Sequence, residues 1–526
     1  MSSLVRAVFA VLLLTLGVGC ASESTPPAPS SPAQADVPPP LVPAMALPEN
    51  AVENAVAKLD GIAERMIAES GIPGMAVAVV HGGKTVYAKG FGVKEVGGTG
   101  EGNQVDADTV FQLASLSKPL AATVVAHQVG VGAVDWDTPI VSKLPWFALS
   151  DPVVTQMVTV GDMLAHRSGL PDHAGDQLED IGYDRRQVLE RLRHLPLDPF
   201  RISYAYTNFG FTAGAEAVAV SAGKPWEQLA DEVLFEPLGM SSTSYRFADY
   251  RDRPNRAVGH IDVDGRYQPT HVRDADPEAP AGGASASAND MTRWLAMVLA
   301  NGNHAGKQLV AAEALLPALT PQIVSSRATE PAMRSGFYGY GFNVGTTSGA
   351  RTELSHSGAF LLGAATNFLI LPSADVAIVA LTNGTPTGVP EALTAEFADL
   401  VQFGEVREDW YRLYTEAIGE LKQPVGSLVG KQAPADPAPA APPASYVGTY
   451  HNDYWGPATI TEVDGGLQLS LGTKLNARLS HWDGNTFTYT WVSENFPPGS
   501  VGKATFDGDT LTLEDYDAFG KGAFVR

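Results

Sequence analysis

The chain has 526 residues, of which 44% are hydrophobic and 18% are charged, which is enough apolar material for a large core and more than one domain. Its 58 acidic residues outnumber its 35 basic residues, and the formal net charge of -23 disfavours binding to nucleic acid or to an anionic lipid surface. We therefore expect a small-molecule or peptide partner and no nucleic acid.

Residues 1–20, MSSLVRAVFAVLLLTLGVGC, have the features of a signal peptide, because Arg6 precedes an apolar stretch too short to span a bilayer. The segment ends at Cys20, the single cysteine of the chain, so no intramolecular disulfide can form. GVGC resembles the cleavage and lipidation site of bacterial lipoproteins, although Gly17 replaces the usual leucine. The alternative is ordinary cleavage beside an incidental cysteine. We expect export to the cell envelope or periplasm, with a lipid anchor at Cys20 as the one attachment to the membrane.

Two segments rich in proline, alanine and serine divide the rest of the chain. The first follows the predicted signal peptide, and its composition predicts an extended tether. The second includes KQAPADPAPAAPPAS, residues 431–445. The predicted organisation is a signal peptide (1–20), a linker (21–48), a large domain (49–405), a helix with a second linker (406–445) and a small C-terminal domain (446–526).

The large domain begins with a helical pattern followed by a strand pattern. Apolar residues recur at helical spacing over residues 53–71, and Gly71 suits a helix C-cap. Residues 74–92, GMAVAVVHGGKTVYAKGFG, form two apolar runs around a Gly-Gly turn, which predicts a hairpin. A helix, a hairpin and further helices indicate an α/β (α+β) domain with an antiparallel sheet flanked by helices.

Three serine-lysine pairs have the spacing Ser-x-x-Lys, at residues 115/118, 221/224 and 500/503. The second lies where Gly223 and a following proline end a helix, and the third lies in a loop entering a strand. Ser115 and Lys118 precede a long apolar run, so we expect both in the first turn of one helix, where residues three apart share a face. Lysine can remove the serine proton only if its environment lowers its pKa, and the N-terminus of a helix favours this.

Two more motifs lie downstream. Tyr206 and Asn208 precede a helical run, and the sequence ELSHSGAFLLG contains His356, Ser357 and Gly358. A second Tyr-x-Asn, at residues 450–452, lies in the small domain and is discounted.

Residues 446–526 alternate apolar and polar residues in short runs such as LQLSLG and TLTLEDY. Asp-Gly turns separate these runs, so we predict antiparallel hairpins closed into a small barrel or sandwich. This domain could act as a lid, a substrate-gating wall or an oligomerisation surface, or it could be a passive appended module.

The three motifs in this order resemble those of the serine beta-lactamase-like superfamily, which includes class C beta-lactamases, low-molecular-weight penicillin-binding proteins, D-aminopeptidases and esterases. Stretches such as MLAHRSGLPDH and LPSADVAIVALTNG extend the resemblance over about residues 50–405. It implies a beta-lactamase/transpeptidase-like domain, and the C-terminal segment resembles the all-β, lipocalin-like domain that follows many such hydrolases.

The resemblance also implies roles for individual residues. Ser115 would attack a carbonyl to form an acyl-enzyme, with Lys118 and Tyr206 moving its proton; which of the two is the base stays open. Asn208 would bind the substrate amide and hold Lys118. The strand with His356, Ser357 and Gly358 would line the site, and the N–H of Ala359 would complete an oxyanion hole with that of Ser115.

His356 stands where many relatives have lysine, and a histidine is only partly charged near neutral pH. Its attraction for a substrate carboxylate should be weaker, so we expect a serine hydrolase acting on an ester or an amide, including peptides with D-amino acids. Beta-lactamase or D-Ala-D-Ala carboxypeptidase activity is the alternative. A non-catalytic penicillin- or peptide-binding envelope lipoprotein is an alternative of another class.

We expect no cofactor and no metal. His166 and His173 flank a Gly-Leu-Pro turn without the spacing of a metal site. The stretch around His166 resembles one that is structural in the superfamily, so a structural role is favoured for His166. No glycine-rich phosphate loop or dinucleotide fingerprint follows a predicted strand.

Overall fold

The computed structural model describes residues 38–526. The predicted signal peptide, Cys20 and most of the linker predicted over 21–48 lie outside these residues. The chain divides into two units, residues 1–42 and 43–526, and the described part of the first contains a short 3-10 turn, η1 (Pro39–Leu41). Among residues 38–526, every helix is too short or too polar to span a bilayer.

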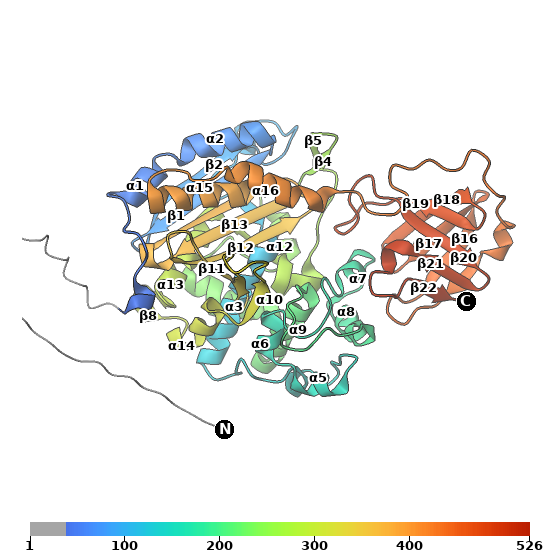
Figure 1. Cartoon of the computed structure of the whole chain (residues 1–526), viewed down its shortest axis with the longest axis horizontal. Helices are drawn as coiled ribbons and strands as arrows, with labels where there is room; N and C mark the ends of the chain where they lie inside the picture. Colours follow the sequence, from blue (N-terminus) through green and yellow to red (C-terminus); the bar gives the residue numbers. More distant parts are fainter. Residues whose placement is uncertain (1–37) are drawn as a thin grey trace, which may run out of the picture. The chain divides into compact units, whose positions relative to one another are not determined.

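The larger sheet has eight strands, all of them antiparallel to their neighbours (Figure 1). Its order is β2-β1-β14-β13-β12-β11-β10-β9, so an early hairpin pairs with a later meander through β1 and β14. The antiparallel sheet predicted from sequence is therefore confirmed. The strands are β1 (Gly74–His81), β2 (Lys84–Gly92), β9 (Ile323–Ser326), β10 (Gly336–Tyr338), β11 (Asn343–Thr346), β12 (Thr352–Phe360), β13 (Ala364–Leu371) and β14 (Val376–Thr382).

The hairpin and the glycine cap predicted near the start of this unit are present. Gly82 and Gly83 have φ of 58° and 70°, the left-handed conformation that a tight two-residue hairpin turn requires. The helical pattern forms two helices rather than one, α1 (Ala51–Val56) and α2 (Leu59–Ser70), and α2 ends at Gly71 with φ of 69°.

The sheet separates two layers of helices because alternate strand residues point to opposite faces. Met75, Val77 and Val79 pack in a core with α1, α2 and α15 (Val389–Phe403), beside α16 (Trp410–Gly419). The intervening residues of β1 pack in a second core with α3 (Ser117–Gly130), α9 (Asn208–Ala222) and α13 (Ala288–Leu299). The remaining helices are α4 (Ile140–Lys143), α5 (Pro152–Met157), α6 (Val160–Leu164), α7 (Asp176–Asp180), α8 (Arg185–Arg191), α10 (Trp226–Ala230), α11 (Glu236–Leu238), α12 (Phe247–Asp252) and α14 (Ala312–Leu315).

Three two-stranded sheets complete this part of the chain. β3 (Val110–Gln112) leads to Ser115 and pairs with β6 (Ser285–Ser287), which follows a π-helical turn at Ala279–Gly283. The pairing therefore holds the segment before Ser115 beside that turn. The other pairs are β4 (Ile261–Val263) with β5 (Arg266–Gln268), and β7 (Asn303–His304) with β8 (Lys307–Gln308).

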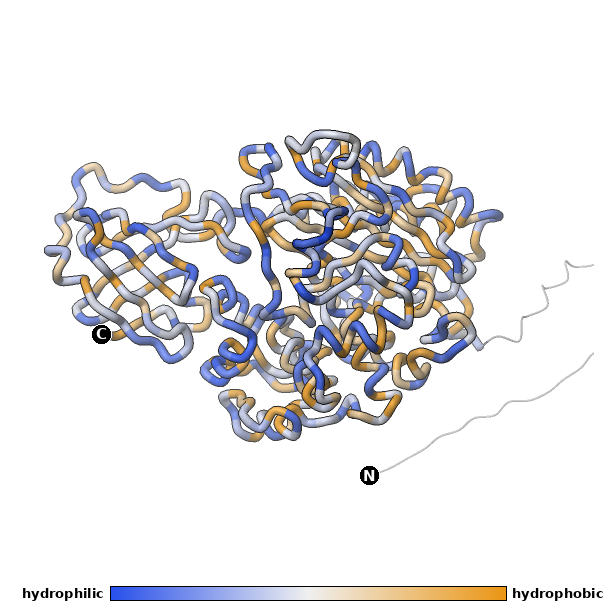
Figure 2. The backbone as a smooth tube through the Cα atoms, turned by 180° about the vertical axis from the view of Figure 1, so that it is seen from behind, coloured by the Kyte–Doolittle hydropathy of each residue, from blue (hydrophilic) through white to orange (hydrophobic). Residues whose placement is uncertain are grey.

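The C-terminal residues form an eight-stranded antiparallel barrel, in agreement with the all-β domain predicted from sequence. A bridge between His451 and Val525 nearly closes it. Alternate residues are buried along much of its strands, as at Leu467, Leu469 and Leu471, and hydrophobic and hydrophilic segments alternate along its trace in Figure 2. The strands are β15 (Gly448–Tyr450), β16 (Ala458–Val463), β17 (Gly466–Leu471), β18 (Leu475–Asp483), β19 (Thr486–Tyr489), β20 (Gly502–Asp507), β21 (Thr510–Leu513) and β22 (Ala523–Val525).

Hydrogen bonds join the barrel to the region around α7. The backbone N–H of Gly175, just before this helix, donates to the hydroxyl of Tyr454 (3.1 Å). Just after the helix, the backbone N–H of Thr473 donates to the carbonyl of Ile181 (2.7 Å). The barrel thus holds both ends of a helix that supplies residues to the site described next.

Candidate active site

Ser115 lies in a strained turn between β3 and α3. The preceding residue, Ala114, has φ of 48°, a left-handed conformation that is unfavourable for a residue with a side chain and that often marks functional sites. We expected Ser115 and Lys118 in one helical turn; instead, Ser115 lies in a 3-10 turn (Ala114–Leu116), and Lys118 lies in the first turn of α3. The side chains still meet, because the two turns follow each other directly.

The Ser115 hydroxyl lies between the two predicted proton carriers. Lys118 Nζ is 3.1 Å from Ser115 Oγ, and the Tyr206 hydroxyl is 2.8 Å from the same atom. Lys118 Nζ also donates to Asn208 Oδ1 (2.6 Å) and to the backbone carbonyl of Ala281 (3.0 Å). Residues from three distant parts of the sequence therefore converge around Ser115 and Lys118.

Burial makes Lys118 a weaker base than an ordinary lysine, because it disfavours the charged ammonium form. Its side chain is 0% exposed, and desolvation lowers its pKa to about 7 even though Glu278 and Asp176 favour its charged form. Nζ also lies 4.5 Å from the centre of the Tyr206 ring. Near neutral pH, a large fraction of Lys118 is the free amine, which can accept a proton.

Tyr206 is held by aromatic packing just before α9. The ring of His166 lies 4.4 Å from the ring of Tyr206, and His166 Nδ1 accepts a hydrogen bond from the backbone N–H of Thr207 (3.1 Å). Burial raises the pKa of Tyr206 well above its ordinary value, so its hydroxyl stays protonated. His166 is buried and packs behind the site, consistent with a structural role.

Asn208 is oriented by an acidic residue that the sequence analysis missed. Asn208 Nδ2 donates to Asp176 Oδ2 (3.0 Å), and this leaves Oδ1 to accept from Lys118. His173 Nδ1 donates to the same oxygen of Asp176 (2.8 Å), and this contact raises the pKa of His173 to about 8. His173 therefore belongs to the site, although its spacing in the sequence gave no sign of this.

β12 runs closely past the Ser115 turn at Gly358. A Cβ atom added to Gly358 would lie 2.2 Å from the carbonyl oxygen of Leu113 and 3.0 Å from Ser115 N. The structure thus requires glycine here, as we expected for close approach of the backbone. Ser357 and Ala359, its neighbours in β12, line the cavity in front of Ser115.

His356 does not occupy the position expected from sequence. It is buried and is not among the residues that line the cavity. Its Nδ1 donates to the carbonyl of Ser357 (2.7 Å), which leaves Nε2 to accept from the Tyr338 hydroxyl (2.8 Å). Burial and nearby Lys118 lower the pKa of His356 to about 3, so it is neutral rather than partly charged near pH 7.

The cavity in front of Ser115 has a volume of about 270 Å³ and an unexpectedly acidic wall. Asp176 and Glu179 come from α7, Glu278 precedes the π-helical turn, and Glu494 comes from the barrel segment between β19 and β20. Sequence reasoning missed all four, because each is an unremarkable carboxylate in a segment without a motif.

Arg273 lies among these carboxylates. It donates to both oxygens of Glu179 (2.9 and 2.8 Å) and to Glu278 (2.8 Å), and Glu494 is 3.7 Å from its Nε. Its guanidinium also lies 4.8 Å from the centre of the Phe360 ring. Arg273 therefore ties the segment before the π-helical turn to α7 and to the barrel.

The other serine-lysine pairs make unrelated contacts. Ser221 donates to the carbonyl of Ala133 (2.9 Å), and Lys224 forms an ion pair with Glu232 just after the helix cap at Gly223. In the barrel, Lys503 pairs with Glu514 (2.7 Å). Neither lysine hydrogen-bonds to its serine, in agreement with the interpretation of both pairs as coincidental.

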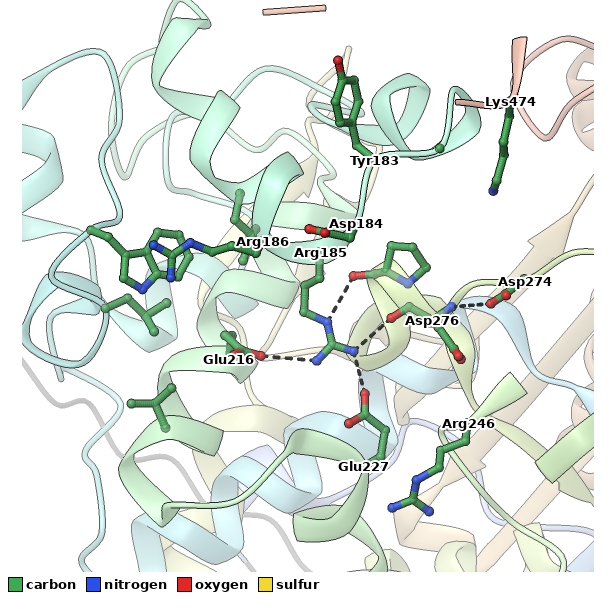
Figure 3. A pocket seen from close by; sticks show the side chains of 16 residues that line it. Tyr183, Asp184, Arg185, Arg186, Glu216, Glu227, Arg246, Asp274, Asp276 and Lys474 are labelled. Carbon is green, nitrogen blue, oxygen red and sulfur yellow. Dashed lines mark hydrogen bonds and ion pairs between the residues drawn. The ribbon is translucent and has the colours of Figure 1, made fainter. Parts of the chain in front are cut away.

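A larger cavity, of about 930 Å³, does not include Ser115 (Figure 3). Arg185 lies at its centre and is bound by Glu227 (2.6 Å), Glu216 (3.3 Å) and two backbone carbonyls. These contacts satisfy the charge of Arg185. Over residues 38–526, no cluster of three or more histidine, cysteine or acidic side chains has a geometry suited to a metal ion.

Comparisons with known proteins show which families and relatives the chain resembles. A family model described as Beta-lactamase matches residues 59–403, and one described as a domain of unknown function (DUF3471) matches residues 432–514. The chain is 28% identical over 408 residues to unguisins hydrolase ungD' of Aspergillus campestris, covering 74% of this chain and 73% of that protein. It is 29% identical over 403 residues to penicillin-binding protein 4 of Amycolatopsis lactamdurans, covering 74% and 96%.

A solved structure shares the fold. The octameric penicillin-binding protein homologue from Pyrococcus abyssi aligns with a TM-score of 0.58 at 17% identity, covering 90% of this chain and 100% of that one. The likeness therefore extends beyond the larger sheet and into the C-terminal part of the chain.

Proposed function

Because the chain belongs to the beta-lactamase family, whose members are serine hydrolases, we propose that it cleaves an ester or amide through an acyl-serine intermediate at Ser115. The observation that carries this proposal is the position of the Ser115 hydroxyl within hydrogen-bond reach of both Lys118 and Tyr206. The proposed substrates include peptides that contain D-amino acids.

A count of hydrogens at Lys118 favours this lysine as the base. A neutral amine has two N–H donors and one lone pair, and two of its three neighbours, Asn208 Oδ1 and the Ala281 carbonyl, can only accept. Both donors are therefore used, and the lone pair faces Ser115 Oγ. Tyr206, whose pKa is raised, donates its proton toward the same oxygen.

In the proposed acylation step, a bond to Ser115 Oγ forms and the bond to the leaving group breaks. Ser115 Oγ forms a bond to the substrate carbonyl carbon while its proton passes to Lys118 Nζ, which gives a tetrahedral intermediate. The bond to the leaving group then breaks, and Tyr206 donates a proton to that group and regains one from Lys118. Water attacks the acyl-enzyme in the reverse sense and releases the acid.

The backbone around Ser115 offers a binding place for the oxyanion. Gly358 allows β12 to approach Ser115 N, and we propose that this N–H and that of Ala359 stabilise the intermediate. Asn208 would orient the substrate through its remaining N–H while Asp176 holds its amide group.

The neutral state of His356 bears on the choice of substrate. With its pKa near 3 and its ring behind the cavity wall, His356 offers no positive charge to a substrate carboxylate. We therefore rank ester or amide hydrolysis above beta-lactamase or D-Ala-D-Ala carboxypeptidase activity, whose substrates carry such a carboxylate. A binding protein that is acylated but not turned over is the alternative of another class.

The test compares Ser115→Ala with a matched control, Ser221→Ala, which alters the serine of a coincidental pair. Each full-length protein is incubated with a short-chain p-nitrophenyl ester, D-alanine p-nitroanilide and a chromogenic cephalosporin. We expect turnover of the ester or the anilide that is lost in Ser115→Ala and kept in Ser221→Ala. Mass spectrometry of an acylated protein without turnover would support the binding alternative, and equal turnover by both variants would refute the role of Ser115.

We also propose that the chain is exported and lipidated at Cys20, on the basis of its N-terminal sequence. Mass spectrometry of the mature N-terminus tests this. A diacylglyceryl group on Cys20 is expected, and a retained N-terminal segment would contradict export.

A further inference from the structure

The cavity in front of Ser115 has more carboxyl groups than basic groups on its wall. Four carboxyl groups line it, those of Asp176, Glu179, Glu278 and Glu494, and its basic lining residues are Arg273 and His173. A ligand that enters this cavity meets more carboxyl oxygens than basic groups.

Arg273 already forms ion pairs with carboxylates of the wall. Its guanidinium is buried at 7% exposure and is bidentate to Glu179, with Glu278 and Glu494 at its other edges. A substrate carboxylate would have to displace one of these partners. Arg273 therefore serves to hold the carboxylates in place more than to attract an anion.

Two of the carboxylates have an oxygen that lacks a partner. Asp176 uses Oδ2 for Asn208 and His173, and Glu278 uses Oε1 for Arg273. Asp176 Oδ1 and Glu278 Oε2 are buried without any hydrogen-bond donor among the described residues. Both side chains are more than nine-tenths buried, and leaving such atoms unpaired is unfavourable.

Burial has a further consequence for the charge of this wall. It raises the pKa of Glu278 well above its ordinary value and that of Glu494 to about 8. A cation bound beside these carboxyl groups would favour their ionised forms.

The wall lies close to the reacting atoms. Asp176 contacts Asn208, Asn208 contacts Lys118, and Lys118 contacts Ser115 Oγ. A group bound by Asp176 and Glu278 would therefore belong to the part of the substrate next to the scissile carbonyl.

The barrel fixes the outer part of this wall. Asp180 accepts hydrogen bonds from the Ser493 hydroxyl (2.7 Å) and from the backbone and side chain of Asn495 (3.0 and 2.9 Å). Glu494, between them, is thereby held at the cavity. The C-terminal domain supplies part of the site instead of being a passive appendage.

From these contacts, we propose that the acidic wall formed by Asp176, Glu278 and Glu494 binds a protonated amino group of the substrate. The substrate class is then an ester or amide whose acyl part bears a free amine close to the carbonyl, such as an aminoacyl group. This inference rests on the proposed function, because it concerns the same Ser115 site.

The test compares three 2-naphthyl esters of similar size on the full-length protein: alanyl (both enantiomers), propionyl and succinyl, whose acyl parts are cationic, neutral and anionic. We expect kcat/KM for one alanyl enantiomer to exceed that for the propionyl ester by at least about tenfold, which corresponds to about 1.4 kcal/mol, with the succinyl ester the poorest. In Glu278→Gln and Glu494→Gln, the alanyl-to-propionyl ratio should fall toward one.

A ratio of two substrates is insensitive to the amount of folded enzyme, so partial unfolding of a variant does not imitate the result. The control is Glu216→Gln, a carboxylate that pairs with Arg185 in the other cavity and should leave the ratio unchanged. Turnover of the propionyl ester without preference for the alanyl esters, or preference for the succinyl ester, would overturn this inference alone. Failure to hydrolyse any ester would overturn it together with the proposed function.

Discussion

Glu494 of the C-terminal barrel accepts a hydrogen bond of 2.6 Å from the backbone N–H of Leu361, two residues beyond Ala359. The other oxygen of the same carboxylate accepts from the N–H of Leu362 (3.3 Å). A side chain from one domain thus fixes the turn that ends β12, the strand that borders the nucleophile. The barrel is linked to the chemistry through this contact.

Removing this carboxylate should loosen the end of β12. In Glu494→Ala, the backbone N–H groups of Leu361 and Leu362 lose their acceptor, so we expect kcat for a neutral ester to fall by about tenfold or more, since an unmade hydrogen bond costs about 1–3 kcal/mol. Steady-state kinetics and thermal unfolding measure the effect. The matched control is Glu462→Ala, an exposed carboxylate on β16, and equal activity of the two variants would contradict the role given to Glu494.

The pH dependence should report the ionisation of Lys118. Because the free amine accepts the serine proton and its pKa is lowered to about 7, kcat/KM should be low in acid and rise with pH through a midpoint near 7. Lys118→Arg should be inactive at every pH, since arginine stays charged. A profile that is flat in this range, or that rises only near the ordinary lysine pKa, would exclude Lys118 as the base.

Asp176 should influence the same midpoint. Its negative charge favours protonated Lys118, so Asp176→Asn should move the midpoint of the profile to lower pH. Activity at the plateau should also fall, because Asp176 orients the amide of Asn208. Asp172→Asn, which alters an exposed carboxylate beside His173, is the control and should leave the midpoint in place. An unchanged midpoint in Asp176→Asn would show that Asp176 does not act on Lys118.

Tyr206→Phe removes one hydroxyl and keeps the packed ring. We expect kcat to fall by about 10²–10⁴-fold, the usual contribution of a proton-transfer group, with little change in the midpoint of thermal unfolding. Tyr204→Phe is the matched control, because Tyr204 packs against the same histidine, His166, at a ring distance of 5.8 Å. A loss of less than about threefold in Tyr206→Phe would remove Tyr206 from the proton path.

Gly358→Ala should damage the site through backbone contacts. The added methyl group would meet Leu113 O at 2.2 Å and Ser115 N at 3.0 Å, and neither backbone atom can move without shifting the nucleophile turn. Lower activity and lower thermal stability are both expected. Gly345→Ala, in β11 of the same sheet, meets nothing nearer than 3.9 Å and should be tolerated. Full activity in Gly358→Ala would contradict the close approach of β12.

Several features were determined by the sequence itself, because they depend on neighbours along the chain. The Gly82-Gly83 hairpin, the glycine cap at Gly71 and the alternating strands of the barrel follow from local backbone preferences and from the period of two. The Ser115-Lys118 spacing likewise brings these side chains together, although the exact turn around Ser115 was not predictable from it.

The orientation of His356 and the wall of the cavity were decided only by the tertiary structure. Which face of β12 meets the cavity depends on its pairing with β13 and on packing against Tyr338, so the sequence motif suggested a substrate contact where the fold buries a neutral ring. Asp176, Glu278 and Glu494 lie far apart in the sequence, and none belongs to a motif. Their convergence depends on long-range packing and on the docking of the barrel. The groups that the fold places around each carboxyl group then determine its pKa and its contacts.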